Sequence, residues 1–274
     1  MTYDLIMLII SSNDLPVYKE FRNIISAYHA KYKDRVRHFY VEFKPDMDED
    51  VLEIGEYIYV KGVESFHPGI YNKTMAAIRH INSKYNYRHI IRTNVSSLWN
   101  LENTLAYQKW LPIFNFAGGI LHEYNFITLE DNNNNVFNFI TGTGIFMTKD
   151  VADKLSNTIL SSDVSLVSNT IKLCAITEIF PDDVSIGFIL GKLGYELNHI
   201  GNEKWRLCIN DSYSIDDFKY NELYYRIKNN DRNIDIILFY KLYNQIYWDY
   251  IDQIEKWDKT TIFLFVIKIK RFHI

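Results

Sequence analysis

Apolar runs and segments of helical apolar spacing alternate along the first hundred residues. Residues 5–10 form a continuous apolar run followed by the polar stretch 11–14, which predicts a strand buried on both faces and a loop after it. From residue 16 to about residue 33, apolar residues recur at helical spacing. The same reasoning predicts the remaining elements of this half: strands at 37–43, 56–60 and 89–93, and a helix over 70–84. This alternation indicates an α/β fold with a mostly parallel sheet and helices on both faces.

The second half of the chain has a less regular pattern. It predicts a tight glycine turn and a short strand over residues 142–148, then a helix capped near Thr148. Residues 171–179 fit either a strand or a helix. The other expected elements are helices over 101–110 and around 236–246, strands at 116–121, 137–141 and 195–200, and an asparagine-rich loop at 132–135. Because no linker or repeat divides the chain, we expect a main domain, residues 1–220, with a C-terminal helical extension, residues 221–274, packed on it.

Composition narrows the classes of function. The chain has 274 residues, 47% of them hydrophobic, so a large core is expected. A net charge of −4 and a sequence pI of about 6.1, without a basic stripe, disfavour nucleic acid as a partner. Only two cysteines occur, Cys174 and Cys208, too few for a disulfide framework or a cysteine-based zinc site. We therefore expect a cytoplasmic protein.

No segment has the pattern of a membrane span. The N-terminal apolar run is short, contains Asp4 and lacks a basic region before it, so it indicates a strand and not a signal peptide. A second apolar run begins at Ile262 and is followed by Lys268, Lys270 and Arg271. This run predicts a buried or edge strand, with peripheral membrane contact as the alternative.

Candidate chemistry centres on the acidic pair Asp182 and Asp183, which follows Pro181 and precedes an apolar, helix-like run. The positive end of a helix dipole favours carboxylates there, and such a pair is suited to proton transfer. The alternative is that one aspartate caps a helix beginning at Val184. Ligands of parallel sheets bind beyond the carboxyl ends of the strands, which makes residues 11–14 and 94–97 the first places to look for a site.

Three blocks carry a resemblance to a known family. They are YNKTMAAIRHINSKYNYRHIIRTNVSSLWN, ITGTGIFMTKDVADKL and FPDDVSIGFILGKLG. Their order and spacing resemble those of the Fringe-like and β-1,3-galactosyltransferase-like glycosyltransferases of GT-A fold. The resemblance covers roughly residues 70–194, and PDDVSIG is its most specific piece.

The resemblance implies roles for individual residues. Asp183 would be the catalytic base of an inverting transfer, and Asp182 would orient it or hold the acceptor sugar. Lys73 resembles the family's helix lysine, although an exposed lysine on a helix is usually only a solvated charge. Residues expected along the sugar cleft are Gly142, Thr143 and Gly144. Residues expected to hold the nucleotide-sugar donor are Ser11, Ser12, Asn13, Lys73, Arg92, Asn94, Ser96 and Ser97.

The chain departs from the family where a DxD motif is expected. Residues 92–97, RTNVSS, contain no carboxylate, and uncharged oxygens would hold Mn²⁺ or Mg²⁺ weakly. Three alternatives follow. The enzyme is metal-independent, with Arg92 or another cation neutralising the leaving phosphate; or a metal is held elsewhere, with His199; or the donor site is inactive.

These inferences predict a glycosyltransferase that moves a sugar from a nucleotide-sugar, a UDP-sugar above all, to a glycan or polysaccharide acceptor. The rival hypothesis is a non-catalytic carbohydrate- or nucleotide-binding module derived from such an enzyme. A nucleotidyltransferase fits less well, because no glycine- and lysine-rich loop follows the first strand.

Overall fold

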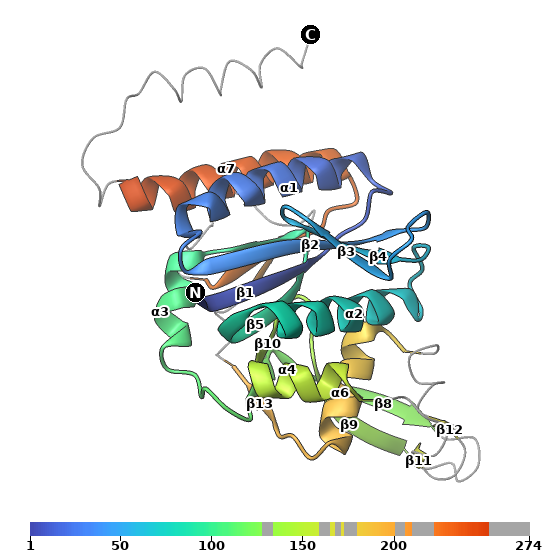
Figure 1. The fold of residues 1–274 in the computed structure, drawn as a ribbon. Helices are drawn as coiled ribbons and strands as arrows, with labels where there is room; N and C mark the ends of the chain where they lie inside the picture. The colour runs from blue at the N-terminus through green and yellow to red at the C-terminus, as the bar shows by residue number, and fades with distance from the viewer. Residues whose placement is uncertain are drawn as a thin grey trace.

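A central sheet of eight strands organises the chain (Figure 1). The structure, a computed structural model, describes residues 1–127, 134–158, 165–167, 171–172, 180–200, 206–209 and 222–251. The strand order is β13-β7-β10-β5-β1-β2-β4-β3. The strands are β1 (Thr2–Ile10), β2 (Val36–Lys44), β3 (Val51–Ile54), β4 (Tyr57–Lys61), β5 (Asn86–Asn94), β7 (Ala117–Gly119), β10 (Ile145–Thr148) and β13 (Leu197–His199).

The sheet is mixed and mostly parallel, as the sequence predicts. β1 lies at its centre and pairs in parallel with β2 and β5, while β2–β4 and β13–β7 are also parallel pairs. β10 runs antiparallel to both β5 and β7, and β3 runs antiparallel to β4. Residues 5–10 of β1 are all buried, since a central strand covered on both faces needs apolar side chains on both. The fold class is therefore α/β.

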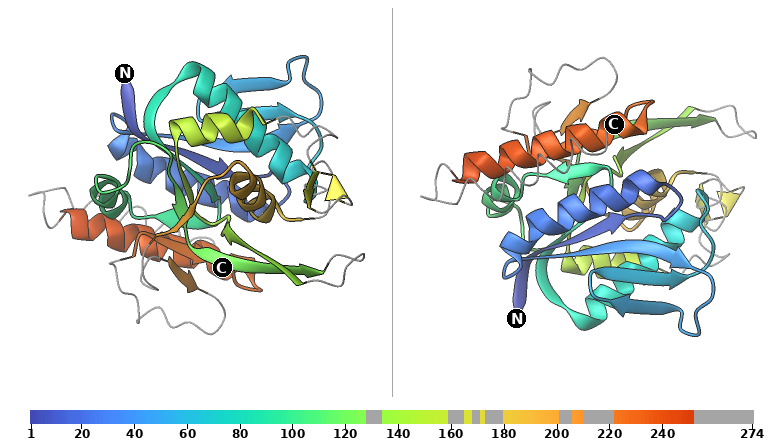
Figure 2. Two further views of the ribbon diagram at one scale, coloured as in Figure 1. Left: turned by 90° about the horizontal axis from the view of Figure 1, so that it is seen from below. Right: turned by 90° about the horizontal axis from the view of Figure 1, so that it is seen from above.

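Helices cover both faces of the sheet (Figures 1 and 2). On one face lie α1 (Pro16–His29), continued by the 3₁₀ turn Ala30–Tyr32, and α7 (Arg232–Ile251). On the other face lie α2 (Gly69–Lys84), α4 (Lys149–Ser156) and α6 (Asp182–Lys192). The helix α3 (Leu101–Gln108) begins with its Asn100 side chain accepting a hydrogen bond from the Asn103 backbone, a usual N-cap.

Each face of the sheet has its own hydrophobic core. In the first, Phe21 of α1 stacks on Phe239 of α7 with ring centroids 4.2 Å apart, which joins the two ends of the described chain. In the second, side chains of α2, α4 and α6 pack on the opposite side of β1 and β5. The periodicity that predicts α1 and α2 is thus explained by burial of one stripe of each helix.

Smaller strand groups surround the central sheet. The hairpin of β8 (Leu121–Ile127) and β9 (Asn134–Ile140) projects beyond the sheet (Figure 2) and contacts α6. The other groups are β6 (Ser97–Trp99) with β15 (Tyr224–Ile227) and β14 (Arg206–Ile209), and β11 (Ser165–Val167) with β12 (Ile171–Lys172).

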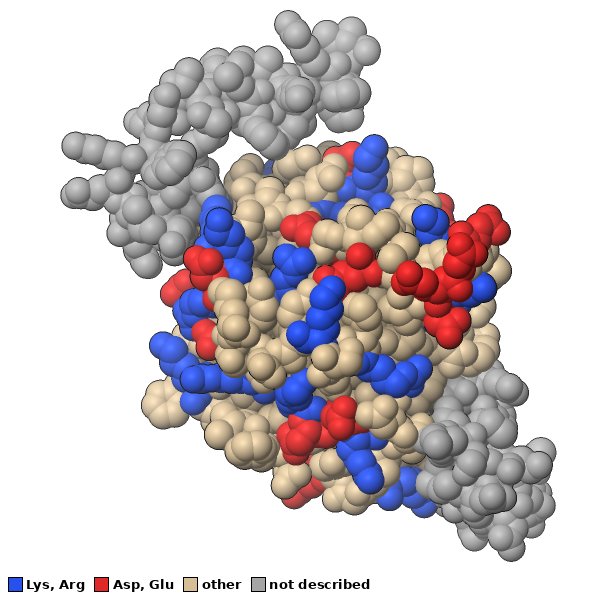
Figure 3. All heavy atoms as spheres, viewed as in Figure 1, with Lys and Arg blue, Asp and Glu red and all other residues tan. Residues whose placement is uncertain are grey.

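The surface carries mixed charge. Lysine and arginine side chains are interspersed with aspartate and glutamate over most of the face in Figure 3, in keeping with the small net charge of −4. Among the helices that the structure describes, none is both long and apolar enough to cross a bilayer.

Several expected boundaries are wrong. The strand predicted at 116–121 is divided between β7 and β8, and Asn134 and Asn135, expected in a loop, lie in β9. Thr148 stands at the N-cap of α4 without capping it, because its hydroxyl bonds to the Phe116 backbone instead. The predictions for residues 173–179, for the apolar run from Ile262 and for Cys174 lie outside the described residues.

Candidate functional site

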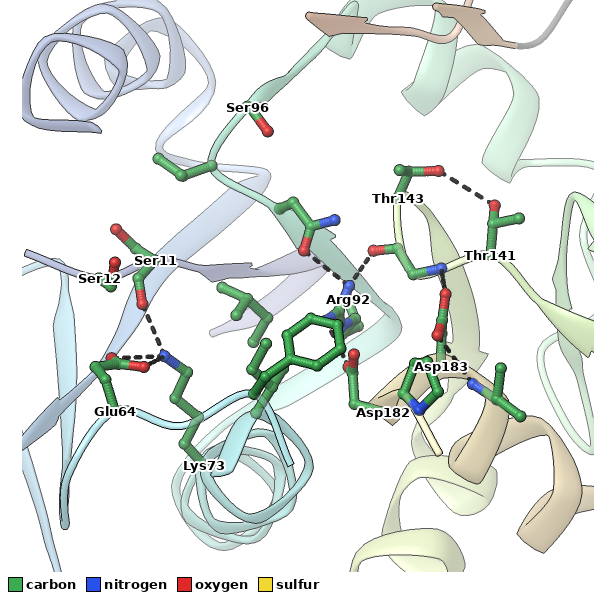
Figure 4. Close-up of a pocket in the computed structure, with 18 of the residues that line it drawn as sticks. Ser11, Ser12, Glu64, Lys73, Arg92, Ser96, Thr141, Thr143, Asp182 and Asp183 are labelled. Carbon is green, nitrogen blue, oxygen red and sulfur yellow. Dashed lines mark hydrogen bonds and ion pairs between the residues drawn. The ribbon is translucent and has the colours of Figure 1, made fainter. Parts of the chain in front are cut away.

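A cavity of about 790 Å³ opens where β1 and β5 end (Figure 4). The strands β1 and β5 are parallel, so both of their carboxyl ends open into it, as expected for an open α/β sheet. The residues that line the cavity include Ser11, Ser12, Glu64, Lys73, Arg92, Asn94, Ser96, Tyr124, Phe139, Thr141, Gly142, Thr143, Asp182, Asp183 and Arg226.

Lys73 joins α2 to the end of β1 on one side of the cavity. Its ammonium donates to both carboxylate oxygens of Glu64, at 2.7 and 2.8 Å, and to the Ser11 carbonyl at 2.8 Å. The side chain is 1% exposed, so the alternative of a solvated helix lysine is wrong. Burial lowers the pKa of Lys73, and the Glu64 carboxylate opposes that shift.

A second buried ion pair fixes the loop after β1. Arg22 of α1 bonds to Glu42 of β2 at 2.7 Å and donates to the Ser11 hydroxyl at 2.8 Å. It also donates to the Ser12 carbonyl and to the Asn13 side chain, both at 3.0 Å. Ser11 and Ser12 line the cavity, whereas the Asn13 side chain is taken up by Arg22 and is not among the lining residues.

Arg92, on β5, lies between the cavity and α6. One terminal nitrogen, Nη2, is 2.5 Å from Asp182 Oδ2, and the other, Nη1, donates to the Gly142 carbonyl and to Asn94 Oδ1. The arginine is 2% exposed. A guanidinium presents its donors in a fixed planar fork, so one side chain bridges three separate segments.

Asp182 and Asp183 have different surroundings. Burial raises the pKa of Asp182, and the Arg92 guanidinium opposes the shift. Asp183 is half-buried and faces the cavity, with Oδ2 accepting from the Gly142 N–H at 2.8 Å and Oδ1 from the Val184 N–H at 3.0 Å. The helix begins at Asp182 after an N-cap at Pro181, so the alternative of an aspartate N-cap before Val184 is wrong.

The glycine turn before β10 lies beside the aspartates. It is a tight turn closed by a hydrogen bond from the Gly144 N–H to the Thr141 carbonyl at 3.1 Å. Gly142 and Thr143 line the cavity, and the Thr143 hydroxyl lies 2.8 Å from the Tyr224 hydroxyl. Gly144 lies behind them, where an added Cβ would be 3.0 Å from the Trp99 ring. Gly144 therefore serves packing, and is not among the residues that line the cavity.

The turn after β5 contributes polar groups. Asn94 and Ser96 line the cavity, and Arg226 of β15 donates to the Ser96 hydroxyl. Ser97 is buried on β6 and does not line it. Arg226 comes from a strand that pairs with β6, which places a cation from the C-terminal part of the chain beside the end of β5.

Two of the four carboxylates that line the cavity, Glu64 and Asp182, are paired with cations and are therefore poorly suited to hold a divalent cation. Glu64 is bound by Lys73, and Asp182 is bound by Arg92. Within the described residues, no group of three or more His, Cys, Asp or Glu side chains is placed to hold a metal. His199 lies exposed on the edge strand β13, where its Nδ1 accepts from the Leu121 N–H at 3.3 Å, and it does not line the cavity.

Comparisons with known proteins give loose likenesses of fold. No family model matches the sequence, and no curated protein matches it. The solved structures that are similar to the chain include the following three. The first, the catalytic domain of Drosophila β1,4-galactosyltransferase 7 in complex with xylobiose, is 10% identical over 74% of this chain and 66% of its own, at a TM-score of 0.39. This chain thus spans just under two thirds of that domain.

The second is a glycosyltransferase involved in the glycosylation of the major capsid of PBCV-1. It is 8% identical over 86% of this chain and 98% of its own, at a TM-score of 0.42. The third, HddC from Yersinia pseudotuberculosis, is 10% identical over 62% of this chain and 87% of its own, at a TM-score of 0.30. The α/β assignment rests on the sheet and helices of the chain itself.

Sequence reasoning missed several cavity residues. Glu64 follows β4 in a loop, and Arg226 lies on a strand far along the chain, so neither belongs to a recognisable motif. The aromatic residues Tyr124 and Phe139 come from the β8–β9 hairpin. Glu64 stands nine residues before Lys73, and this spacing of opposite charges is too common on protein surfaces to predict a buried ion pair.

Proposed function

We propose that this chain is an inverting glycosyltransferase that uses a nucleotide-sugar donor, a UDP-sugar above all. The observation that carries the proposal is the half-buried carboxylate of Asp183, which faces the cavity at the carboxyl ends of β1 and β5. Two backbone N–H groups hold its oxygens, at 2.8 and 3.0 Å. A carboxylate fixed in this way is suited to act as a general base.

In the proposed reaction, Asp183 removes the proton from an acceptor hydroxyl as that oxygen attacks the anomeric carbon. The new bond joins the acceptor oxygen to the anomeric carbon, and the bond from that carbon to the donor phosphate oxygen breaks. The proton remains on Asp183, and the nucleoside diphosphate leaves with the bonding electron pair. Attack from the face opposite the leaving group inverts the anomeric configuration.

The size of the cavity and one of its cations support a nucleotide-sugar. Its volume of about 790 Å³ lies within the range of about 300–1,000 Å³ that is usual for small-molecule sites. A departing diphosphate needs positive charge near it. The lining includes Lys73 and Arg92, which are paired with Glu64 and Asp182, and Arg226, which donates to the Ser96 hydroxyl at the end of β5; we propose that Arg226 faces the diphosphate. Because Glu64 and Asp182, two of the carboxylates in the lining, are paired with cations, the proposed reaction does not use a divalent metal.

The acceptor side of the proposed site lies near Asp183. Tyr124 and Phe139 of the β8–β9 hairpin line the cavity there, and Tyr124 contacts Phe180 with ring centroids 5.2 Å apart. Aromatic walls with a few polar groups are usual in sites for small molecules. We propose that a sugar of a glycan or polysaccharide acceptor binds against this wall.

The first experiment combines a donor screen with transfer assays. UDP-, GDP- and CDP-sugars are tested for thermal stabilisation, each with Mn²⁺ and with EDTA, and a donor that binds the folded state raises Tm. Donors that stabilise the protein are then incubated with oligosaccharides, and the anomeric configuration of the product is read by NMR. Transfer that persists in EDTA supports the metal-independent alternative, whereas loss of transfer in EDTA refutes it.

The second experiment replaces the proposed base. Asp183→Asn should lower kcat by about 10²–10⁴-fold, the usual contribution of a general base, while donor binding changes little. Asp153→Asn, at an exposed position of α4, is the matched control and should leave kcat unchanged. Undiminished transfer by the Asp183 variant refutes the assignment. Donor binding without transfer by the wild type favours the rival, a non-catalytic binding module.

A further inference from the structure

Both backbone polar groups of Gly142, which belong to successive peptide units, are bound by charged side chains. Its carbonyl accepts from Arg92 Nη1, and its N–H donates to Asp183 Oδ2 at 2.8 Å. Arg92 is itself fixed by Asp182, with Nη2 2.5 Å from Oδ2 (Figure 4). The four residues therefore form a closed chain of contacts that begins at Asp182 and ends at its neighbour Asp183. We name this group the Gly142 clasp.

The clasp leaves no room for a side chain at its centre. A Cβ added to Gly142 would lie 2.6 Å from Arg92 Nη1 and 3.1 Å from both Cβ and Oδ2 of Asp183. The nearest approach is well inside ordinary van der Waals contact, so one of the two charged side chains would have to move. Glycine is thus required here by close approach to charged side chains, whereas an added Cβ at Gly144, the other glycine of the turn, would meet the Trp99 and Tyr224 rings.

Buried contacts hold Arg92 in the Gly142 clasp. It is 2% exposed, and the Asp182 side chain is 9% exposed. Removing one partner of such a pair leaves a buried charge without compensation, which is strongly unfavourable. If the Arg92 guanidinium moved away from Asp182 to bind a substrate, the Asp182 carboxylate would be left as an uncompensated buried charge. The contacts of Arg92 therefore favour a fixed role over direct capture of the donor phosphate.

We propose that Arg92 and Asp182 are positioning residues. They fix the backbone of Gly142 through its carbonyl, so that the Gly142 N–H orients the Asp183 carboxylate toward the acceptor hydroxyl. The inference rests on the proposed function of Asp183 and assigns its neighbours a different task. Asp182 does not touch the acceptor; it acts through Arg92 and Gly142. Oδ1 of Asp183 is fixed independently by the Val184 N–H, so the clasp determines the direction in which Oδ2 points.

The kinetic test uses two variants that disturb the clasp in different ways. Asp182→Asn removes the charge that holds Arg92, and Gly142→Ala leaves all charges in place but displaces Arg92 or Asp183. Each should lower kcat roughly 10–100-fold, the scale expected for a misplaced reacting group. The Michaelis constant for the donor should change less than about twofold, since that group does not bind it. UDP-glucose, UDP-galactose and UDP-N-acetylglucosamine serve as probes.

Gly191→Ala is the matched control for the glycine variant. Gly191 lies on the same helix as Asp183, and an added Cβ there meets no atom within 4 Å. This variant should keep the kcat of the wild type. A folded Gly142→Ala or Asp182→Asn protein with unchanged kcat overturns the positioning role, and so does a loss confined to the Michaelis constant.

An NMR measurement tests the clasp without activity. In the Asp182→Asn protein the Gly142 amide should exchange with solvent at least about tenfold faster than in the wild type, because its hydrogen bond to Asp183 is loosened. Amides of β1 should be unaffected. Equal Gly142 exchange in the two proteins overturns the clasp. If the wild type transfers no sugar, the proposed function fails, and the exchange experiment still decides whether Asp182 holds Gly142.

Discussion

Replacing Lys73 with methionine removes the ammonium group that joins α2, the Glu64 loop and the end of β1. The group makes three hydrogen bonds, two to Glu64 and one to the Ser11 carbonyl, and it is 1% exposed. Breaking a fully buried ion pair costs about 3–5 kcal/mol. Glu64 is 25% exposed, so water compensates part of its charge. We therefore expect the free energy of unfolding to fall by about 2–3 kcal/mol.

Urea denaturation at neutral pH measures this change. For a chain of this size, each kcal/mol corresponds to about 2–4 °C in Tm, so Tm should fall by about 4–12 °C. The double variant Lys73→Met/Glu64→Gln should be less destabilised than Lys73→Met, because no unpaired charge remains. Lys154→Met, at an exposed position of α4, is the control. If Lys73→Met lowers the free energy of unfolding by no more than about 0.5 kcal/mol, the value usual for surface substitutions, the ion pair does not stabilise the fold as expected.

Two further predictions concern stability. The hydrogen bond from His38 to Glu56 lowers the pKa of Glu56 from 4.5 to about 2. The ionised Glu56 carboxylate therefore adds to the free energy of unfolding above pH 4.5, and this stabilisation is lost as pH falls toward 2. The stability difference between wild type and Glu56→Gln in urea titrations should therefore narrow from pH 6 to pH 3; a constant difference contradicts this. Gly187→Ala should cost about 1–3 kcal/mol by the same assay, because its Cβ would lie 2.6–2.7 Å from Phe139 Cβ and Cα. An added Cβ at Gly191 has no atom within 4 Å, so an equal loss of stability in Gly191→Ala would contradict that explanation.

The central strands and helices were predictable because the way each is buried determines the spacing of its apolar residues along the sequence. β1 is covered on both faces and is therefore apolar throughout, and α1 and α2 each bury one stripe. The short strand β3 was missed because it lies at the sheet edge, where its four residues are at most half-buried. β6 was missed for a different reason, since its buried serine stands in a segment whose polarity indicates a turn.

The site was predictable only in part. The three sequence blocks predicted site roles for Lys73, Arg92, Gly142, Asp182 and Asp183, and all five line the cavity. The partners of these residues were not predictable, because the ion pair between Arg92 and Asp182 depends on how α6 packs against β5. The direction of β10 is likewise a tertiary property, and it places the glycine turn at the same sheet edge as the end of β5.

The Arg92–Asp182 pair also bears on how the protein folds. Its two members are 90 residues apart in sequence, and Gly142 is 50 residues from Arg92 and 41 from Asp183. Closing loops of that length costs chain entropy before any contact repays it, so contacts of high sequence separation form late. The pairing of β1 with β2 closes a shorter stretch of chain. The geometry around Asp183 is thus a product of completed folding, and a nascent chain that ends before α6 holds an arginine on β5 whose counter-charge has yet to be synthesised.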